Sequence, residues 1–179
     1  ASATPPAYAQ SSRRKRSVSL EEAEEVHQRT LIIDGHNDVP VEGVARGHNP
    51  LNWKQRDPAF HTDIPRMQET GYAAAFFIVG DGPIANVWVT IERTFHEIKQ
   101  NPQHLLLVKS SQDVIRASEQ GKIGVIMSIE GIGRWLDGKP EIQRILYRLG
   151  VRLMAVTHGE GGTEEKYLQG SRSPYGPCT

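Results

Sequence analysis

Residues 123–130 read IGVIMSIE, an almost unbroken apolar run that ends in a glutamate. Similar runs are LIID at 31–34, YAAAFFIV at 72–79 and VRLMAV at 151–156. Their apolar residues follow one another instead of alternating with polar residues, which is typical of strands buried on both faces. We therefore predict an α/β fold with four parallel strands in a sheet covered by helices.

The segments between these runs carry helix signals. Ser19 and Glu22 form a capping box, and Gly150 follows an apolar i, i+3, i+4, i+7 pattern as a stop signal. A long loop is expected from Gly43 to Pro58, where Gly, Asn and Pro residues are frequent and periodic apolar positions are few. The predicted helices cover about 19–29, 62–70, 87–98, 110–120 and 140–149.

Two architectures fit this order of elements, a doubly wound open sheet and a (β/α)8 barrel. Four strands are too few for a complete barrel, which typically needs about 250 residues. The chain has 179 residues, of which 37% are hydrophobic and 23% charged, which is an ordinary globular composition. Its 21 basic and 21 acidic residues cancel, so nucleic acid is not expected as a partner.

Several sites and segments are excluded by residue usage. Cys178 is the single cysteine, so neither an intrachain disulfide nor a cysteine-based zinc cluster can form. No apolar run reaches the roughly 18 residues of a transmembrane helix, so none is expected in this chain. Residues 1–18 are expected to be a disordered basic tail or a signal-peptide remnant. Export is favoured by the small residues around Tyr8, although the apolar stretch that precedes a cleavage site is absent.

Polar residues follow three of the predicted strands at the point where each strand ends. They are Asp34, His36 and Asp38 after the first strand, Glu130 after the third and His158 after the fourth. Because the carboxyl ends of parallel strands meet at one edge of the sheet, these side chains are expected to gather there.

Each of these residues also has a structural interpretation. His36 and Asp38 are two apart and can converge on one ion, or Asp38 can cap backbone amides in a turn. Glu130 at the end of a buried strand is costly unless it binds a metal or pairs with Arg134 or Arg152. His158 is either a structural histidine or part of the same site.

Other catalytic motifs are incomplete. The glycines at 131 and 133 lack the third glycine of a dinucleotide fingerprint, and neither a Walker sequence nor a G-x-S-x-G elbow occurs. What remains is a metal site with oxygen and nitrogen ligands, which suits Zn2+.

The run LIIDGHNDVP at 31–40 closely resembles the opening signature of the membrane (renal-type) dipeptidases, metallopeptidase family M19. The blocks TDIPR at 62–66, SIEG at 128–131, LYRLGVR at 146–152 and TH at 157–158 are similar to that family's successive blocks, in order. The resemblance implies a (β/α)8 TIM barrel that hydrolyses dipeptides with two zinc ions and a metal-bridged hydroxide.

Carried onto this chain, the resemblance implies specific roles. His36 and Asp38 would bind one zinc, Glu130 would bridge both zinc ions as a ligand and catalytic residue, and His158 would contact the substrate. The family's other zinc ligands are two histidines on later strands, so residues 19–179 are expected to be the N-terminal half of the barrel, about four βα units. Such a fragment alone is expected to bind zinc weakly and to leave dipeptides uncleaved.

Two other functions are kept as alternatives. One is a non-catalytic α/β binding module, which gains if His36, Asp38 and Glu130 do not converge. The other is a TIM-barrel metallohydrolase of the amidohydrolase type, which usually opens with two histidines where this chain has His36 and Asp38. Dipeptides are the expected substrates, and a homodimer is a further expectation.

Overall fold

The computed structural model describes residues 17–49, 51–80, 84–136 and 139–156, and the chain divides into two units, residues 1–30 and 31–179. The first unit contains α1 (Leu20–Gln28), which has no buried residue. The Ser19 hydroxyl accepts a hydrogen bond from the Glu22 N–H at 3.1 Å, and the Glu22 carboxylate accepts one from the Ser19 N–H at 3.0 Å. The predicted capping box is therefore confirmed.

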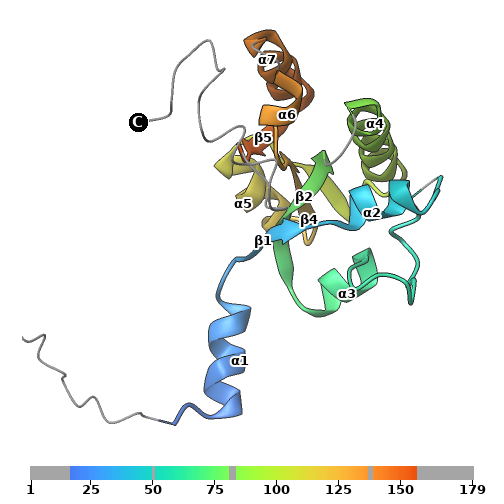
Figure 1. Cartoon of the computed structure of the whole chain (residues 1–179). Coiled ribbons are helices and arrows are strands. Elements are labelled where there is room, and N and C mark those ends of the chain that lie inside the picture. Colours follow the sequence, from blue (N-terminus) through green and yellow to red (C-terminus); the bar gives the residue numbers. More distant parts are fainter. Residues whose placement is uncertain (1–16, 50, 81–83, 137–138, 157–179) are drawn as a thin grey trace, which may run out of the picture. The chain divides into compact units, whose positions relative to one another are not determined.

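The second unit is built on a five-stranded parallel sheet (Figure 1). Its strands are β1 (Ile32–Asn37), β2 (Tyr72–Gly80), β3 (Leu105–Leu107), β4 (Ile123–Ile129) and β5 (Val151–Met154). β2 lies between β1 and β4, and it pairs with β4 along residues 124–129. The other edge of β4 is shared, because β3 pairs with residues 123–125 and β5 with residues 127–129.

All four predicted strands are present, and the parallel pairing is as expected. The prediction of four strands was nevertheless wrong by one, because β3 is a fifth. This strand has three residues and no alternation, so no periodicity distinguishes it from the end of a helix connection. It is held by the backbone of β4, where the Ile123 N–H donates to the His104 carbonyl at 2.8 Å.

Six helices are described in the second unit. Their bounds are α2 (Val39–Ala45), α3 (Ile64–Glu69), α4 (Ile84–Gln100), α5 (Ser111–Glu119), α6 (Gly133–Leu136) and α7 (Pro140–Leu149). The predicted helices at 62–70, 87–98, 110–120 and 140–149 correspond to α3, α4, α5 and α7. Helices α2 and α6 were not predicted.

The expected loop from Gly43 was wrong at its start, because α2 runs to Ala45. Pro40 stands in the first turn, where proline is tolerated, and Gly43 is buried against Leu51. A Cβ on Gly43 would lie 2.7 Å from the Leu51 Cδ2 atom, so a larger residue here would force the Leu51 side chain to shift. Tertiary contacts thus override the low helix propensity of the segment.

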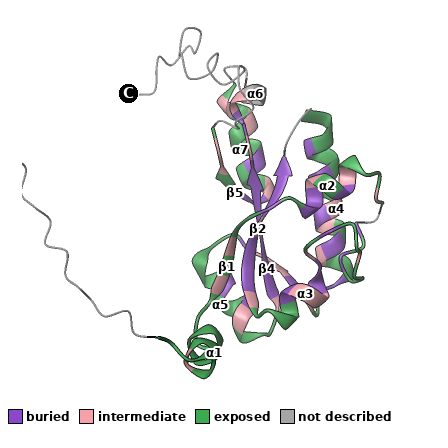
Figure 2. Ribbon diagram, turned by 60° about the horizontal axis from the view of Figure 1, so that its bottom comes forward, coloured by how far each residue is buried: buried purple, intermediate pink, exposed green. Residues whose placement is uncertain are grey.

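The two faces of the sheet are covered by different helices (Figure 2). Successive residues of a strand point to opposite faces of the sheet, so alternate residues share a face. Ala75, Phe77 and Val79 of β2 face the buried side chains of α2, α3, α4 and α7. Ala74 of β2 and Ile126 of β4 face Val114 of α5. The core therefore lies on both sides of β2 and β4.

The outer strands β1 and β5 are less buried than expected. Ile33 is 45% exposed and Leu153 is 39% exposed, although a strand buried on both faces was predicted in each case. Within the described residues β1 pairs with β2 and β5 pairs with β4, so each has one strand neighbour. Ile33 pairs with Ala74 and Leu153 with Ser128, which places both on the same face as Ile126.

The start of α5 gives a prediction about acid stability. The Asp113 carboxylate accepts hydrogen bonds from the Lys109 N–H at 2.9 Å and the Ser110 hydroxyl at 3.0 Å, and it pairs with Arg116. These contacts, the Lys109 N–H foremost, hold the pKa of Asp113 below its usual range. A lowered folded-state pKa adds stability above the unfolded pKa of about 3.9, and this stability is lost as the pH falls through the folded pKa.

Asp113→Asn is therefore expected to lower the urea midpoint at about pH 6 and to match the parent near pH 2. Urea titrations at both pH values, followed by circular dichroism, measure this difference. Glu141→Gln is the control, because that carboxylate is exposed and Arg144 is its one ion-pair partner among the described residues. An equal deficit of the Asp113 variant at both pH values would contradict the linkage.

Candidate metal centre

The carboxyl edge of the sheet brings together residues from β1 and β4. His36 lies near the end of β1, Asp38 follows that strand directly, and Glu130 follows β4. The intervening strand β2 ends at Gly80, whose carbonyl accepts the Glu130 N–H at 3.0 Å. Glycine contributes no side chain at this point, so the side chains from β1 and β4 can meet across the end of β2.

His36 stands between the two carboxylates. Its Nε2 atom lies 3.3 Å from the Asp38 Oδ1 atom and 3.2 Å from the Glu130 Oε1 atom. Half of the His36 side chain is exposed, whereas 16% of the Glu130 side chain is exposed. The site is therefore open on the β1 side and more enclosed at Glu130.

These distances allow a direct test of whether the residues fit a metal ion. The three candidate ligand atoms all lie within 4.8 Å of one another. Bonds of about 2.0–2.1 Å in tetrahedral geometry separate two ligand atoms by about 3.3 Å, close to both observed distances from His36. One imidazole and two carboxylates form an N/O ligand set that suits Zn2+, so the residues fit the ion.

The structure tests the structural interpretation of Asp38, and it tests that of Glu130 only for a pair with Arg152. Asp38 is the N-cap residue of α2, but its side chain makes no capping hydrogen bond. Arg152 donates to the backbone carbonyls of Lys109, Tyr147 and Val151 rather than serving Glu130. The side chain of Arg134 lies outside the described part of the chain.

The cluster of His36, Asp38 and Glu130 is the one group of three or more His, Cys, Asp or Glu side chains with converging ligand atoms among the described residues. His158, predicted to contact substrate, falls outside them. The roles assigned to all four residues stay predictions.

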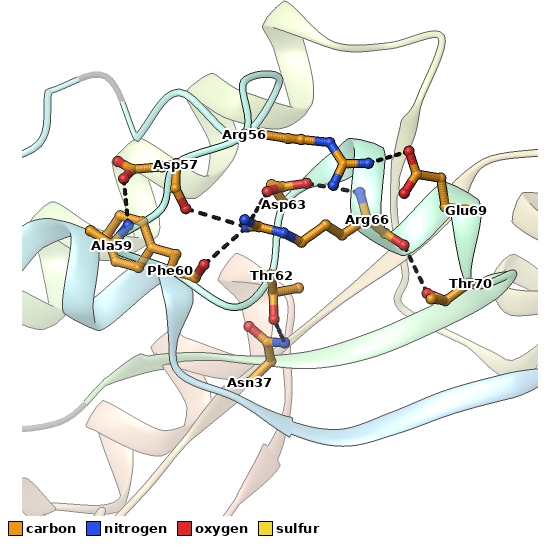
Figure 3. A network of polar contacts seen from close by, with 10 residues as sticks. All are labelled: Asn37, Arg56, Asp57, Ala59, Phe60, Thr62, Asp63, Arg66, Glu69 and Thr70. Carbon is orange, nitrogen blue, oxygen red and sulfur yellow. Dashed lines mark hydrogen bonds and ion pairs between the residues drawn. The ribbon is translucent and has the colours of Figure 1, made fainter.

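A polar network connects the end of β1 to the loop before α3. The Asn37 amide donates to the Thr62 hydroxyl at 3.1 Å, and next to Thr62 the Asp63 carboxylate accepts the Arg66 N–H at 2.8 Å (Figure 3). The Arg66 guanidinium also pairs with Asp63 and donates to the Phe60 carbonyl at 2.9 Å. The loop before α3 is thereby tied to the strand that carries His36.

Sequence reasoning assigned no function to Asn37 or Thr62. A local signal was present for Asn37, because Asp and Asn side chains in turns often hydrogen-bond to backbone groups two or three residues away. The partner Thr62 lies 25 residues away, however, and no local pattern pairs it with Asn37.

A comparison with protein families gives one match that covers most of the chain. The model of the family described as membrane dipeptidase (peptidase family M19) matches residues 20–165. Dipeptidase verJ of Clonostachys rogersoniana is 27% identical over an alignment of 148 residues, with 71% of this chain and 37% of that protein covered.

Solved structures show the same fold. The probable dipeptidase PvdM of Pseudomonas aeruginosa superposes with a TM-score of 0.65 at 16% identity, covering 79% of this chain and 38% of that one. A metallo peptidase of Rhodobacter sphaeroides, liganded with a phosphinate mimic of the dipeptide L-Ala-D-Ala, superposes with a TM-score of 0.64 at 16% identity. The superposition covers 72% of this chain and 45% of that one. The expected fold class, part of a (β/α)8 barrel, is thus confirmed, and the chain spans less than half the length of these relatives.

Proposed function

Because this chain belongs to the membrane dipeptidase family, peptidase family M19, we propose that the protein containing it is a zinc-dependent dipeptidase. The observation that carries the proposal is the convergence of His36, Asp38 and Glu130 at the carboxyl edge of a parallel sheet. In parallel α/β folds that edge is where catalytic groups gather. The nitrogen and oxygen ligands of this cluster are those expected in a member of a metallopeptidase family.

Each residue of the cluster has a separate task in the proposal. His36 offers its Nε2 atom as a nitrogen ligand, and Asp38 offers a carboxylate from the same strand end. Glu130 has two carboxylate oxygens and approaches from β4, so it is the residue suited to hold two metal ions at once. The two carboxylates contribute a charge of −2, which attracts dications to this edge.

A catalytic zinc ion, when bound, supplies a Lewis acid and lowers the pKa of a water molecule to about 7. The chain's own contribution is to hold the ligands and to leave space for the substrate. His36 and Asp38 are about half exposed, so a small substrate can reach them from solvent. His158 is proposed to hydrogen-bond that substrate.

The alternative of a non-catalytic binding module is disfavoured by the same geometry. It required that His36, Asp38 and Glu130 fail to converge, and they lie within bridging distance. The alternative of another amidohydrolase-type enzyme is disfavoured by the family match over residues 20–165.

Metal removal tests the proposal directly. Exhaustive chelation of the purified protein that contains this chain is expected to reduce hydrolysis of a simple dipeptide to the level of the buffer alone. Added Zn2+ should restore it, whereas added Mg2+ should not, because N/O sites with histidine favour zinc. Release of free amino acids measures the rate. Undiminished hydrolysis after chelation would refute a metal-dependent mechanism.

A further inference from the structure

We propose that Asp34 is a positioning residue for the metal centre, setting the backbone turn that carries His36 and Asp38. The inference rests on the proposed function, since it assumes that His36 and Asp38 bind a metal ion. It assigns a task to a carboxylate that is not itself among the three converging ligands.

The first support is a defect in the β1–β2 ladder at this point. Asp34 pairs with Ala75 and Asn37 pairs with Phe77, so three steps along β1 oppose two steps along β2. The pairing is irregular over the residues between Asp34 and Asn37, which include His36. Regular strand pairing therefore does not determine where His36 lies.

The Asp34 carboxylate accepts hydrogen bonds in the segment where the pairing of β1 with β2 is irregular. Its Oδ1 atom accepts the His36 N–H at 3.0 Å, and its Oδ2 atom accepts the Asn37 side-chain amide at 3.0 Å. Burial, followed by the charge of Asp34 and a hydrogen bond to it, raises the pKa of Tyr72. Hydrogen bonds to an ionised carboxylate are stronger than those between neutral groups, so these contacts can hold the turn.

Asn37 extends the support to both sides of Asp38. Its side-chain carbonyl accepts the Val39 N–H at 3.3 Å, while its amide donates to Asp34 and to the Thr62 hydroxyl at 3.1 Å. Asn37 is 7% exposed, so these contacts are largely shielded from water. The residues on either side of Asp38 are thereby fixed, and the Asp38 side chain stays available for a metal ion.

A specific chemical consequence follows for Asp34→Asn. An asparagine keeps one acceptor oxygen but places an NH2 group against one of the donors, either the His36 N–H or the Asn37 amide. Loss of such supporting contacts typically weakens a metal site 10- to 100-fold. We expect zinc affinity to fall by about that factor while His36, Asp38 and Glu130 are all retained.

The test measures the zinc affinity of the protein that contains this chain, by competition with a chromogenic chelator. Asp57→Asn is the matched control, because the Asp57 carboxylate also accepts a backbone N–H two residues later, from Ala59 at 2.8 Å, but it is not hydrogen-bonded to His36, Asn37 or Thr62 in any described contact. Thr62→Val removes one hydroxyl from the network and is expected to weaken zinc binding several-fold. Thermal unfolding of the metal-free proteins reports separately on stability.

The outcomes separate the two proposals. Zinc binding and dipeptide hydrolysis by the parent, with affinity reduced in Asp34→Asn and Thr62→Val but not in Asp57→Asn, support the positioning role. Parental affinity in a less stable Asp34→Asn variant would show a purely structural role and overturn the inference alone. A parent that does not bind zinc would overturn the proposed function as well. If Asp34→Asn does not fold, parental affinity in Thr62→Val overturns the positioning network.

Discussion

Glu130→Gln is expected to abolish dipeptide hydrolysis and to weaken zinc binding by more than about 100-fold, the upper range for loss of a residue that only supports a ligand. Glutamine keeps the shape of the side chain but loses the charge and one of the two acceptor oxygens. In the proposed function Glu130 would use its two carboxylate oxygens to hold two metal ions, so this conservative change would remove one of those ligand atoms.

The variant should fold normally, because Glu130 follows β4 rather than packing in the core. Its N–H still donates to the Gly80 carbonyl, since the backbone is unchanged. Dipeptide turnover and bound zinc per protein are the measurements, with Glu42→Gln as the control. Glu42 is an exposed carboxylate on α2 outside the cluster, so its variant should keep parental turnover. Turnover in Glu130→Gln comparable to the parent would refute the assignment of Glu130.

Glu97→Ala is expected to reduce the free energy of unfolding by about 2–5 kcal/mol. Glu97 lies on α4 and is 2% exposed. Its Oε1 atom accepts the Asn52 N–H at 2.8 Å and its Oε2 atom accepts the Trp53 N–H at 3.1 Å. Alanine leaves both amides without this acceptor, and an unsatisfied buried donor costs about 1–3 kcal/mol.

The surrounding loop makes these two hydrogen bonds hard to replace. Asn52 has a φ of 61°, in the left-handed region, where asparagine is found more often than most residues other than glycine. Next to it, the Trp53 ring stacks on Phe77 with 4.9 Å between centroids, and Trp53 is 2% exposed. The Glu97 carboxylate therefore ties the loop after α2 to the core at this turn.

Urea unfolding at neutral pH measures the loss. Glu97→Gln keeps one acceptor and is expected to fall between the parent and Glu97→Ala. Glu92→Ala is the matched control, because Glu92 is an exposed residue of the same helix and its loss should change stability by less than about 0.5 kcal/mol. A Glu97→Ala variant as stable as this control would show that Glu97 does not anchor the loop.

The long central strands were predictable because a strand buried on both faces has consecutive apolar residues. β4 is buried at every position from Ile123 to Ile129, and the continuous apolar run at those residues indicates this burial in the sequence. Helix starts were predictable for a similar reason, since a cap such as Ser110 accepting the Asp113 N–H involves residues three apart. The candidate ligands could be named because each directly follows, or lies at the end of, such a strand.

Elements determined by distant residues were missed. α2 contains Pro40 and Gly43, which no local pattern marks as helical, and Leu51 packs closely against Gly43. β3 is three leucines, and each pairs with a residue of β4 that lies 18 positions further along the chain. The exposure of Ile33 on β1 depends on which strands lie beside it, and one apolar run looks the same at an edge or in the centre of a sheet.

The amino-acid sequence alone determined the α/β class, the positions of the long strands and the residues that stand at their carboxyl ends. Tertiary structure alone decided that His36 and Glu130, 94 positions apart, come within 3.2 Å across the end of β2. It also decided that the Asp34 carboxylate accepts the His36 N–H and that the Asn37 amide joins the end of β1 to the Thr62 hydroxyl. The physical reason is range: hydrophobic runs and caps act within a few residues, whereas a converging site depends on the register of separate strands, which packing of the whole sheet sets.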